Sequence, residues 1–126
     1  MTGGKGRLVY VLDDDEAVRD SLCFLLTSHG IACEAFGSPP EFLGGFDPAR
    51  AGCLVLDLHM PWLSGLEVLE KLRSRGVTMP VIVVSGRRNS ASDAALLEAG
   101  ALIVLNKPVD VGELLALIRA AMDAVP

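Results

Sequence analysis

The chain has 126 residues, of which 51% are hydrophobic and 21% are charged, so it can bury a core and does not have the composition of a disordered segment. Its formal net charge of −5 argues against binding of nucleic acid through the phosphate backbone, which takes clusters of Lys and Arg. No apolar run approaches the ~20 residues of a membrane-spanning helix, and residues 1–7 lack the apolar stretch of a signal peptide.

Two patterns alternate along the chain, short β-branched or apolar runs and stretches with apolar residues at helical spacing. The first pattern predicts strands and the second predicts helices. Some residues mark the ends of the predicted helices. Ser38 and Pro39 mark the start of the short helix, and Gly30 marks the end of the first helix. In chain order the predicted elements are strand 7–12, helix to 30, strand 31–36, short helix 38–45, strand 53–58, helix 64–75, strand 81–85, helix 90–99, strand 101–105 and helix 110–123.

Strands in strict alternation with helices need crossover connections, which favour a parallel sheet with helices on both faces. The runs at 53–58 and 81–85 are almost wholly apolar, as strands covered on both faces are. We therefore expect a doubly wound α/β sandwich with five strands. We also expect a single domain over residues 1–126, with its core at about 7–123, located in the cytoplasm.

The three cysteines, Cys23, Cys33 and Cys53, are odd in number and do not have C-x-x-C spacing. A disulfide framework or a zinc site has a different pattern. Because all three lie among apolar residues, we expect them to be core or half-buried side chains.

Polar side chains follow four of the predicted strands. These are Asp13 and Asp14, Asp57, Ser85 and Lys107. The carboxyl ends of parallel strands lie at one edge of the sheet, where ligands bind in open α/β folds, so these side chains should converge. Each of them alone has an ordinary alternative role, as a helix cap, a turn residue or a surface charge. Asp15 and Glu16 fit the start of the following helix, where negative charge is favourable.

Five motifs in order carry a family resemblance: Asp13-Asp14, DLHMPWLSG at 57–65, VIVVS at 81–85, EAGA at 98–101 and NKP at 106–108. With them, residues 7–120 resemble the receiver domains of two-component response regulators. The stretch CEAFGSPPEFL is similar to receivers often joined to a helix-turn-helix output domain. The resemblance implies a flavodoxin-like sheet of order 2-1-3-4-5.

The resemblance also implies a site for Mg²⁺ or Mn²⁺. Its ligands would be the carboxylates of Asp14 and Asp57 and the backbone carbonyl of His59, with Asp13 acting largely through water. Oxygen ligands of this kind suit hard divalent cations. A cation would also relieve the repulsion of three neighbouring carboxylates, about 4 kcal/mol for each close pair at an effective dielectric constant of 20.

In such a domain Asp57 would take a phosphoryl group from a sensor histidine kinase or phosphotransfer protein. Lys107 would neutralise charge on the transferring oxygens, and Ser85 would then bind a phosphoryl oxygen. That contact would switch the face formed by helix 90–99, strand 101–105 and helix 110–123. The resemblance further suggests a cis bond between Lys107 and Pro108.

The sequence departs from the family pattern at Val104, where most receivers have a tyrosine or phenylalanine that turns inward on activation. Ile103 replaces a residue that is often acidic. Together with Leu102, Leu105 and alanines at 91, 94 and 95, these residues predict either an apolar output face that forms a homodimer or binds a partner, or simply more core.

His59 and Arg87 hold positions that tune the rate of dephosphorylation in the family. The sequence does not predict whether they raise or lower that rate. Trp62 is expected to pack on its own loop.

Three other functions fit the sequence less well. A phosphatase of the haloacid-dehalogenase type uses Asp-x-Asp, whereas this chain has Asp57-Leu58-His59. A flavin carrier of similar topology would need a phosphate-binding loop where Asp13 and Asp14 stand. A pseudo-receiver that serves as a scaffold without phosphorylation is disfavoured by the full set of acids, hydroxyl and lysine. We expect a signalling switch that is not a metabolic enzyme.

Overall fold

The computed structural model describes residues 7–58, 64–86 and 90–123. In these ranges five parallel strands form one sheet in the order β2-β1-β3-β4-β5. The strands are β1 Leu8–Leu12, β2 Cys33–Phe36, β3 Ala51–Asp57, β4 Val81–Ser85 and β5 Ile103–Asn106. The helices are α1 Glu16–Ser28, α2 Pro39–Gly45, α3 Gly65–Ser74, α4 Ser90–Glu98 and α5 Val111–Asp123, with a short 3₁₀ turn at Pro48–Arg50. The predicted fold class is confirmed.

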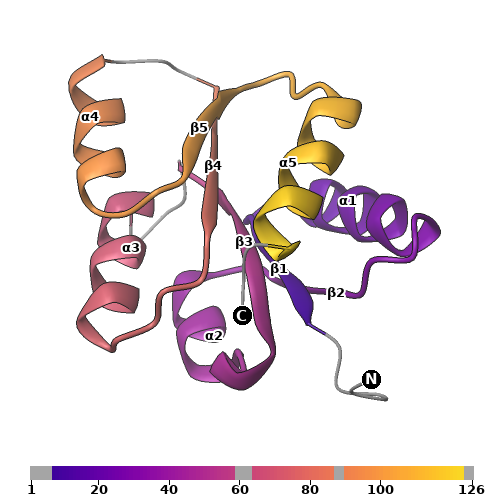
Figure 1. The fold of residues 1–126 in the computed structure, drawn as a ribbon, viewed down its shortest axis with the longest axis horizontal. Helices are drawn as coiled ribbons and strands as arrows, with labels where there is room; N and C mark the ends of the chain where they lie inside the picture. The colour runs from indigo at the N-terminus through magenta and orange to yellow at the C-terminus, as the bar shows by residue number, and fades with distance from the viewer. Residues whose placement is uncertain (1–6, 59–63, 87–89, 124–126) are drawn as a thin grey trace.

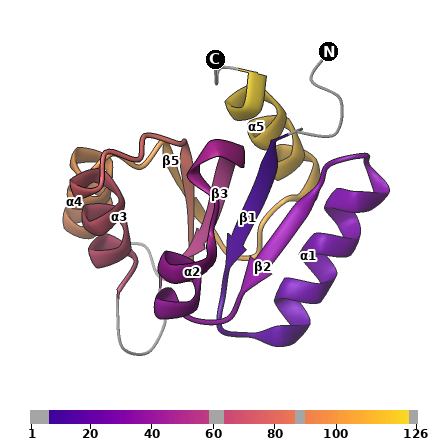
Figure 2. The ribbon, with the colours of Figure 1, turned by 90° about the horizontal axis from the view of Figure 1, so that it is seen from below.

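The helices cover both faces of the sheet. Figures 1 and 2 show α1 and α5 on one face and α2, α3 and α4 on the other. Each face has its own core cluster, because alternate strand residues point to opposite sides. In β1, Tyr10 packs with α2, α3 and α4 residues, whereas Val9 and Val11 pack with α1 and α5 residues. None of the helices in the described part of the chain is long and apolar enough to cross a bilayer.

Local side-chain chemistry fixes several helix ends. The hydroxyl of Ser38 accepts a hydrogen bond from the backbone N–H of Glu41, and Ser64 forms a capping box with Glu67, so both helices begin as predicted. Gly30 ends α1 with a φ of 77°, a left-handed conformation that glycine adopts without steric cost.

Two strands begin later than predicted, for one shared reason. The backbone N–H of Ile31 donates to the carbonyl of Leu26, and that of Ala101 donates to the carbonyl of Leu96. Both amides therefore close the preceding helix before the chain enters the sheet, and β2 and β5 begin at Cys33 and Ile103.

The cysteine expectation was right for Cys53, which is buried in β3 with a free thiol. It was wrong in leaving out a disulfide, because Cys23 of α1 and Cys33 of β2 are bonded to each other. Spacing reveals local cysteine motifs only, and these two positions meet through the packing of a helix on an edge strand.

Candidate functional site

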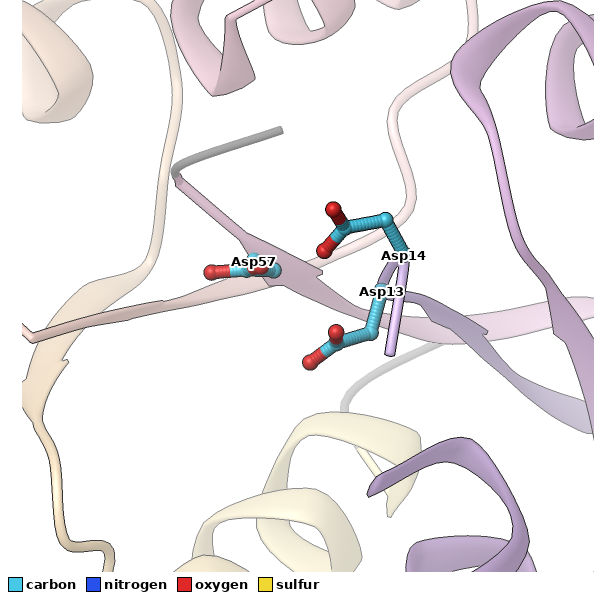
Figure 3. A group of neighbouring side chains, drawn as sticks. All are labelled: Asp13, Asp14 and Asp57. Atoms are coloured by element: carbon cyan, nitrogen blue, oxygen red, sulfur yellow. The ribbon is translucent and has the colours of Figure 1, made fainter. Parts of the chain in front are cut away.

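Three carboxylates meet at the carboxyl edge of the sheet. Asp57 is the last residue of β3, and Asp13 and Asp14 directly follow β1, which is the strand beside it. One carboxylate oxygen from each of the three lies within 4.8 Å of the others. Figure 3 shows the three side chains lying together at the ends of the two strands. The predicted convergence of these acids is confirmed by the geometry.

Two of the three acids are buried. Asp13 is 6% exposed and Asp57 is 5% exposed, whereas Asp14 is exposed. Burial raises the pKa of the Asp13 carboxyl above its ordinary value, and the charges of Asp57 and Asp14 raise it further, against a hydrogen bond from the Asp15 backbone and the charge of Lys107. Among the residues that the structure describes, the carboxylates of this site outnumber the positive groups beside them, an imbalance that favours a cation.

The first turn of α1 fixes the position of Asp13. The backbone N–H of Asp15 donates to Asp13 Oδ1 at 2.9 Å, and Arg19 Nη1 donates to the Asp13 carbonyl at 2.9 Å. Asp15 Oδ1 accepts from the N–H groups of Ala17 and Val18 at 2.9 and 3.3 Å, so Asp15 caps the helix, as predicted. The role of Arg19 was not predicted, because an arginine one turn into a helix resembles any solvated charge.

Lys107 brings a positive charge to the same place. Its Nζ atom lies 3.3 Å from Asp57 Oδ1, and its backbone N–H donates to the Ser85 carbonyl at 2.9 Å. Ser85 ends β4, is fully buried, and pairs in register with Asn106. The bond between Lys107 and Pro108 is cis, as predicted.

A hollow of about 500 Å³ opens over these groups, and it is lined by Asp13, Asp14, Asp15, Val18, Asp57, Gly86 and Lys107. Hard oxygen donors at such spacing suit Mg²⁺ or Mn²⁺. Among the described residues that line the hollow, the aspartates outnumber the single lysine, so their electrostatic field attracts a cation. The residues present therefore fit a divalent cation.

Other predicted residues have different outcomes. His59, Arg87 and Trp62 lie outside the described residues. Val104 is buried in β5 with the core cluster on the α2, α3 and α4 side. Because a valine is fixed there, no ring can turn inward at this position.

The expected apolar output face divides into core and surface. Leu105 is buried and Ile103 is half-buried against the α1 and α5 side of the core. Leu102, by contrast, is 51% exposed, and Leu97 of α4, which the sequence did not single out, is 50% exposed. Part of the predicted face is therefore core, whereas Leu102, Ala91 and Ala94 from the prediction remain at the surface, and Leu97 is exposed in addition.

Comparison with known proteins adds an independent finding. Residues 9–119 match the sequence model of the response regulator receiver domain. The chain is 42% identical over 114 residues to the transcriptional regulatory protein FixJ of Azorhizobium caulinodans, covering 90% of this chain and 54% of that protein. It is 38% identical over 122 residues to the response regulator protein TodT of Pseudomonas putida, covering 97% of this chain and 54% of that protein.

Solved structures show the same architecture. The crystal structure of FixJ-N superposes with a TM-score of 0.86 at 33% identity, covering 95% of this chain and 96% of that one. The response regulator StyR gives a TM-score of 0.87 at 34% identity, covering 94% of this chain and 60% of that one. The chain spans about half the length, 54%, of the curated relatives FixJ and TodT.

Proposed function

Because the chain belongs to the response regulator receiver domain family, we propose that it is the phospho-acceptor switch of a two-component system. Its relatives are named as response and transcriptional regulators, so it is a signalling protein rather than a metabolic enzyme. Residues 7–123 form the receiver unit in this proposal, and it acts in the cytoplasm without contacting nucleic acid itself.

Asp57 is the phospho-acceptor in this proposal. One of its carboxylate oxygens attacks the phosphorus of a phosphohistidine on a sensor histidine kinase or phosphotransfer protein. The bond to the histidine nitrogen breaks, and the phosphoryl group becomes an acyl phosphate on Asp57. The observation that supports this role most is the position of Lys107 Nζ, 3.3 Å from Asp57 Oδ1, where its charge can offset that of the transferring oxygens.

Asp14 and Asp57 are the proposed direct ligands of the cation, together with the backbone carbonyl of His59, and Asp13 acts on it largely through water. When bound, Mg²⁺ or Mn²⁺ would neutralise the carboxylates and the oxygens of the incoming phosphoryl group. Asp15 and Arg19 keep Asp13 in position for this role through their hydrogen bonds to its carboxylate and carbonyl.

Ser85 is the proposed sensor of the acyl phosphate. Its hydroxyl lies at the end of a buried strand, so binding a phosphoryl oxygen draws the chain that follows β4 toward the site. The movement changes the face formed by α4, β5 and α5, which regulates an output domain or partner, or forms a homodimer. Val104 transmits it by packing, without an aromatic ring, and His59 and Arg87 tune the lifetime of the phosphoryl group.

The test is phosphorylation by acetyl phosphate in the presence of Mg²⁺, followed by intact mass. Wild type should gain one acid-labile phosphoryl group and Asp57→Asn should gain none. Asp15→Asn is the matched control, because it removes a neighbouring negative charge but keeps the backbone N–H that donates to Asp13 and an oxygen that can cap α1. The modification should stay intact in this variant. The fluorescence of Trp62, the only tryptophan in the sequence, should respond to beryllofluoride in wild type but not in Asp57→Asn. A wild type that gains no phosphoryl group would overturn the proposal in favour of a pseudo-receiver scaffold.

A further inference from the structure

The disulfide between Cys23 and Cys33 is not used by the proposed phosphotransfer. It joins α1 to the first residue of β2 across a sequence separation of 10, with a Cα–Cα distance of 5.6 Å. Both residues are only half-buried, so small molecules in solution can reach them. Cys53, by contrast, is fully buried and cannot exchange with either of them without unfolding.

The fold brings the two cysteines together independently of their bond. The turn between them is closed by hydrogen bonds from the N–H groups of His29 and Ile31 to the carbonyl of Leu26, at 3.0 and 2.9 Å. Arg119 of α5 also donates to the carbonyl of His29 at 3.2 Å. Two thiols held in this way close a disulfide at a high effective concentration. In the cytoplasm, however, glutathione and thioredoxin keep accessible thiols largely reduced.

We propose that Cys23 and Cys33 are a reversible dithiol–disulfide pair, oxidised by a low-molecular-weight disulfide such as glutathione disulfide, and that closure of the bond clamps α1 to β2. One cysteine thiolate attacks a sulfur of glutathione disulfide and releases one glutathione thiolate. The other cysteine, as a thiolate, then attacks the mixed disulfide and releases the second. The protein loses two electrons and two protons, and two molecules of glutathione are formed.

The clamp acts at the edge of the sheet. β2 is an edge strand of 4 residues, none of them fully buried, and it pairs with β1 alone. α1 carries Arg19 and is capped by Asp15, and both residues hold Asp13 through hydrogen bonds. It also forms one wall of a groove of about 690 Å³ that α5 residues line on the other side and that reaches Asp57. Oxidation therefore stiffens the helix that both positions Asp13 and borders this groove.

The first test counts thiols by maleimide labelling of the folded protein and intact mass. After reduction two thiols should react, with Cys53 reacting only on unfolding, and after treatment with glutathione disulfide none should react. Cys33→Ser should instead accumulate one glutathione on Cys23, because the second attack is missing. Two reactive thiols in wild type after oxidation, or a disulfide that excess reduced glutathione does not reopen, would overturn the proposal.

The second test measures the clamp by hydrogen exchange of the folded protein in both redox states. Amides of α1 and β2 should exchange about tenfold more slowly in the oxidised form, while those of α3 should not change. Cys53→Ala should respond as wild type does, and the double variant Cys23→Ser, Cys33→Ser should not respond. If the amides of α1 and β2 exchange at equal rates in oxidised and reduced wild type, the disulfide does not clamp α1 to β2 and the proposal is wrong. The pair does not depend on phosphorylation, so it is tested equally well in Asp57→Asn.

Discussion

At the scale of single residues, Asp13 is held in an unfavourable charged state. Its carboxylate is buried close to Asp57 and Asp14, and both burial and these charges raise its pKa. Two charges at about 5 Å repel by about 3 kcal/mol at an effective dielectric constant of 20, and Lys107 offsets part of this. With divalent cations chelated, we expect Asp13→Asn to raise the free energy of unfolding by about 1–2 kcal/mol, measured by urea denaturation.

The pH and metal dependence of this substitution follow from the same raised pKa. Folding makes the charged form of Asp13 less favourable than it is in the unfolded chain. This cost is relieved, and wild type should gain stability relative to Asp13→Asn, as pH falls through the folded pKa toward the ordinary value of 3.8. Mg²⁺ should stabilise wild type more than Asp13→Asn. Asp15→Asn keeps an oxygen for its cap and should change stability little. A less stable Asp13→Asn under chelation would contradict the prediction.

Cys53 gives a second prediction at this scale, on stability in alkaline solution. Burial raises the pKa of its thiol from 9.0 to about 12, so the folded protein holds this proton where the unfolded chain releases it. The stability of the fold is unaffected by this group below pH 9 and falls between pH 9 and 12. A shift of this size corresponds to about 4 kcal/mol at the upper end.

The measurement is urea denaturation of oxidised wild type and Cys53→Ala from pH 8 to 11. Cys53→Ala should be the less stable protein at neutral pH, because it leaves a cavity, but its stability should fall less steeply above pH 9. Tyr10, whose pKa burial also raises, is present in both proteins and cancels in the comparison. Parallel pH profiles of the two proteins would show that the thiol does not titrate in this way.

At the scale of elements, Arg73 ties the end of α3 to two loops. Its guanidinium donates to the carbonyls of Val77, Met79 and Gly100, at 2.9, 3.2 and 2.7 Å. These carbonyls precede β4 and β5, and two of the bonds are partly buried. We expect Arg73→Ala to lower the free energy of unfolding by about 2–3 kcal/mol, because carbonyls shielded from water lose their donors.

Arg75 is the matched control for this prediction. It lies two residues further along the chain, and its guanidinium donates an exposed hydrogen bond to the carbonyl of Leu43 at 2.9 Å. Arg75→Ala should cost less than about 1 kcal/mol. If the two variants unfold at the same urea concentration, Arg73 does not hold these elements together.

The same elements show how far local sequence predicts structure. The apolar runs and the caps at Ser38 and Ser64 locate every strand and helix, although β2 and β5 begin two residues later than predicted and β3 begins two residues earlier. What the sequence could not reveal are bonds between distant segments. The amides of Ile31 and Ala101, which close helices, the three acceptors of Arg73 and the pairing of Cys23 with Cys33 depend on tertiary packing.

At the scale of the whole molecule, the site could be predicted because topology alone places the strand ends together. Asp13, Asp57 and Lys107 are far apart in the chain, yet a parallel sheet of this order brings carboxylate oxygens of the two acids within 4.8 Å of each other and Lys107 Nζ to 3.3 Å from Asp57 Oδ1. Which apolar side chains are exposed at the surface could not be predicted in the same way. Leu102 and Ile103 are adjacent aliphatic residues of similar size. Only the packing of β5 leaves Ile103 half-buried and Leu102 exposed.

That difference sharpens the test of the proposed output face. Leu102 and Leu97 are 51% and 50% exposed, so Leu102→Asp should leave the free energy of unfolding within about 0.5 kcal/mol of wild type. If the α4, β5 and α5 face forms a homodimer, the substitution should weaken beryllofluoride-dependent association at least about tenfold, because a charge would be buried in the interface. Sedimentation velocity with Mg²⁺ and beryllofluoride measures this directly.

Two further variants make the outcome specific to that face. Phe24 of α1 is 76% exposed, and α1 lies on the other face of the sheet from α4 (Figure 1), so Phe24→Asp should associate as wild type does. Ile103→Asp would also place a charge against the core on the α1 and α5 side, so any loss of association would be mixed with a loss of stability. Leu102→Asp separates the two effects. If it associates normally while Phe24→Asp does not, the copies meet through α1, and the α4, β5 and α5 face is left free for an output domain.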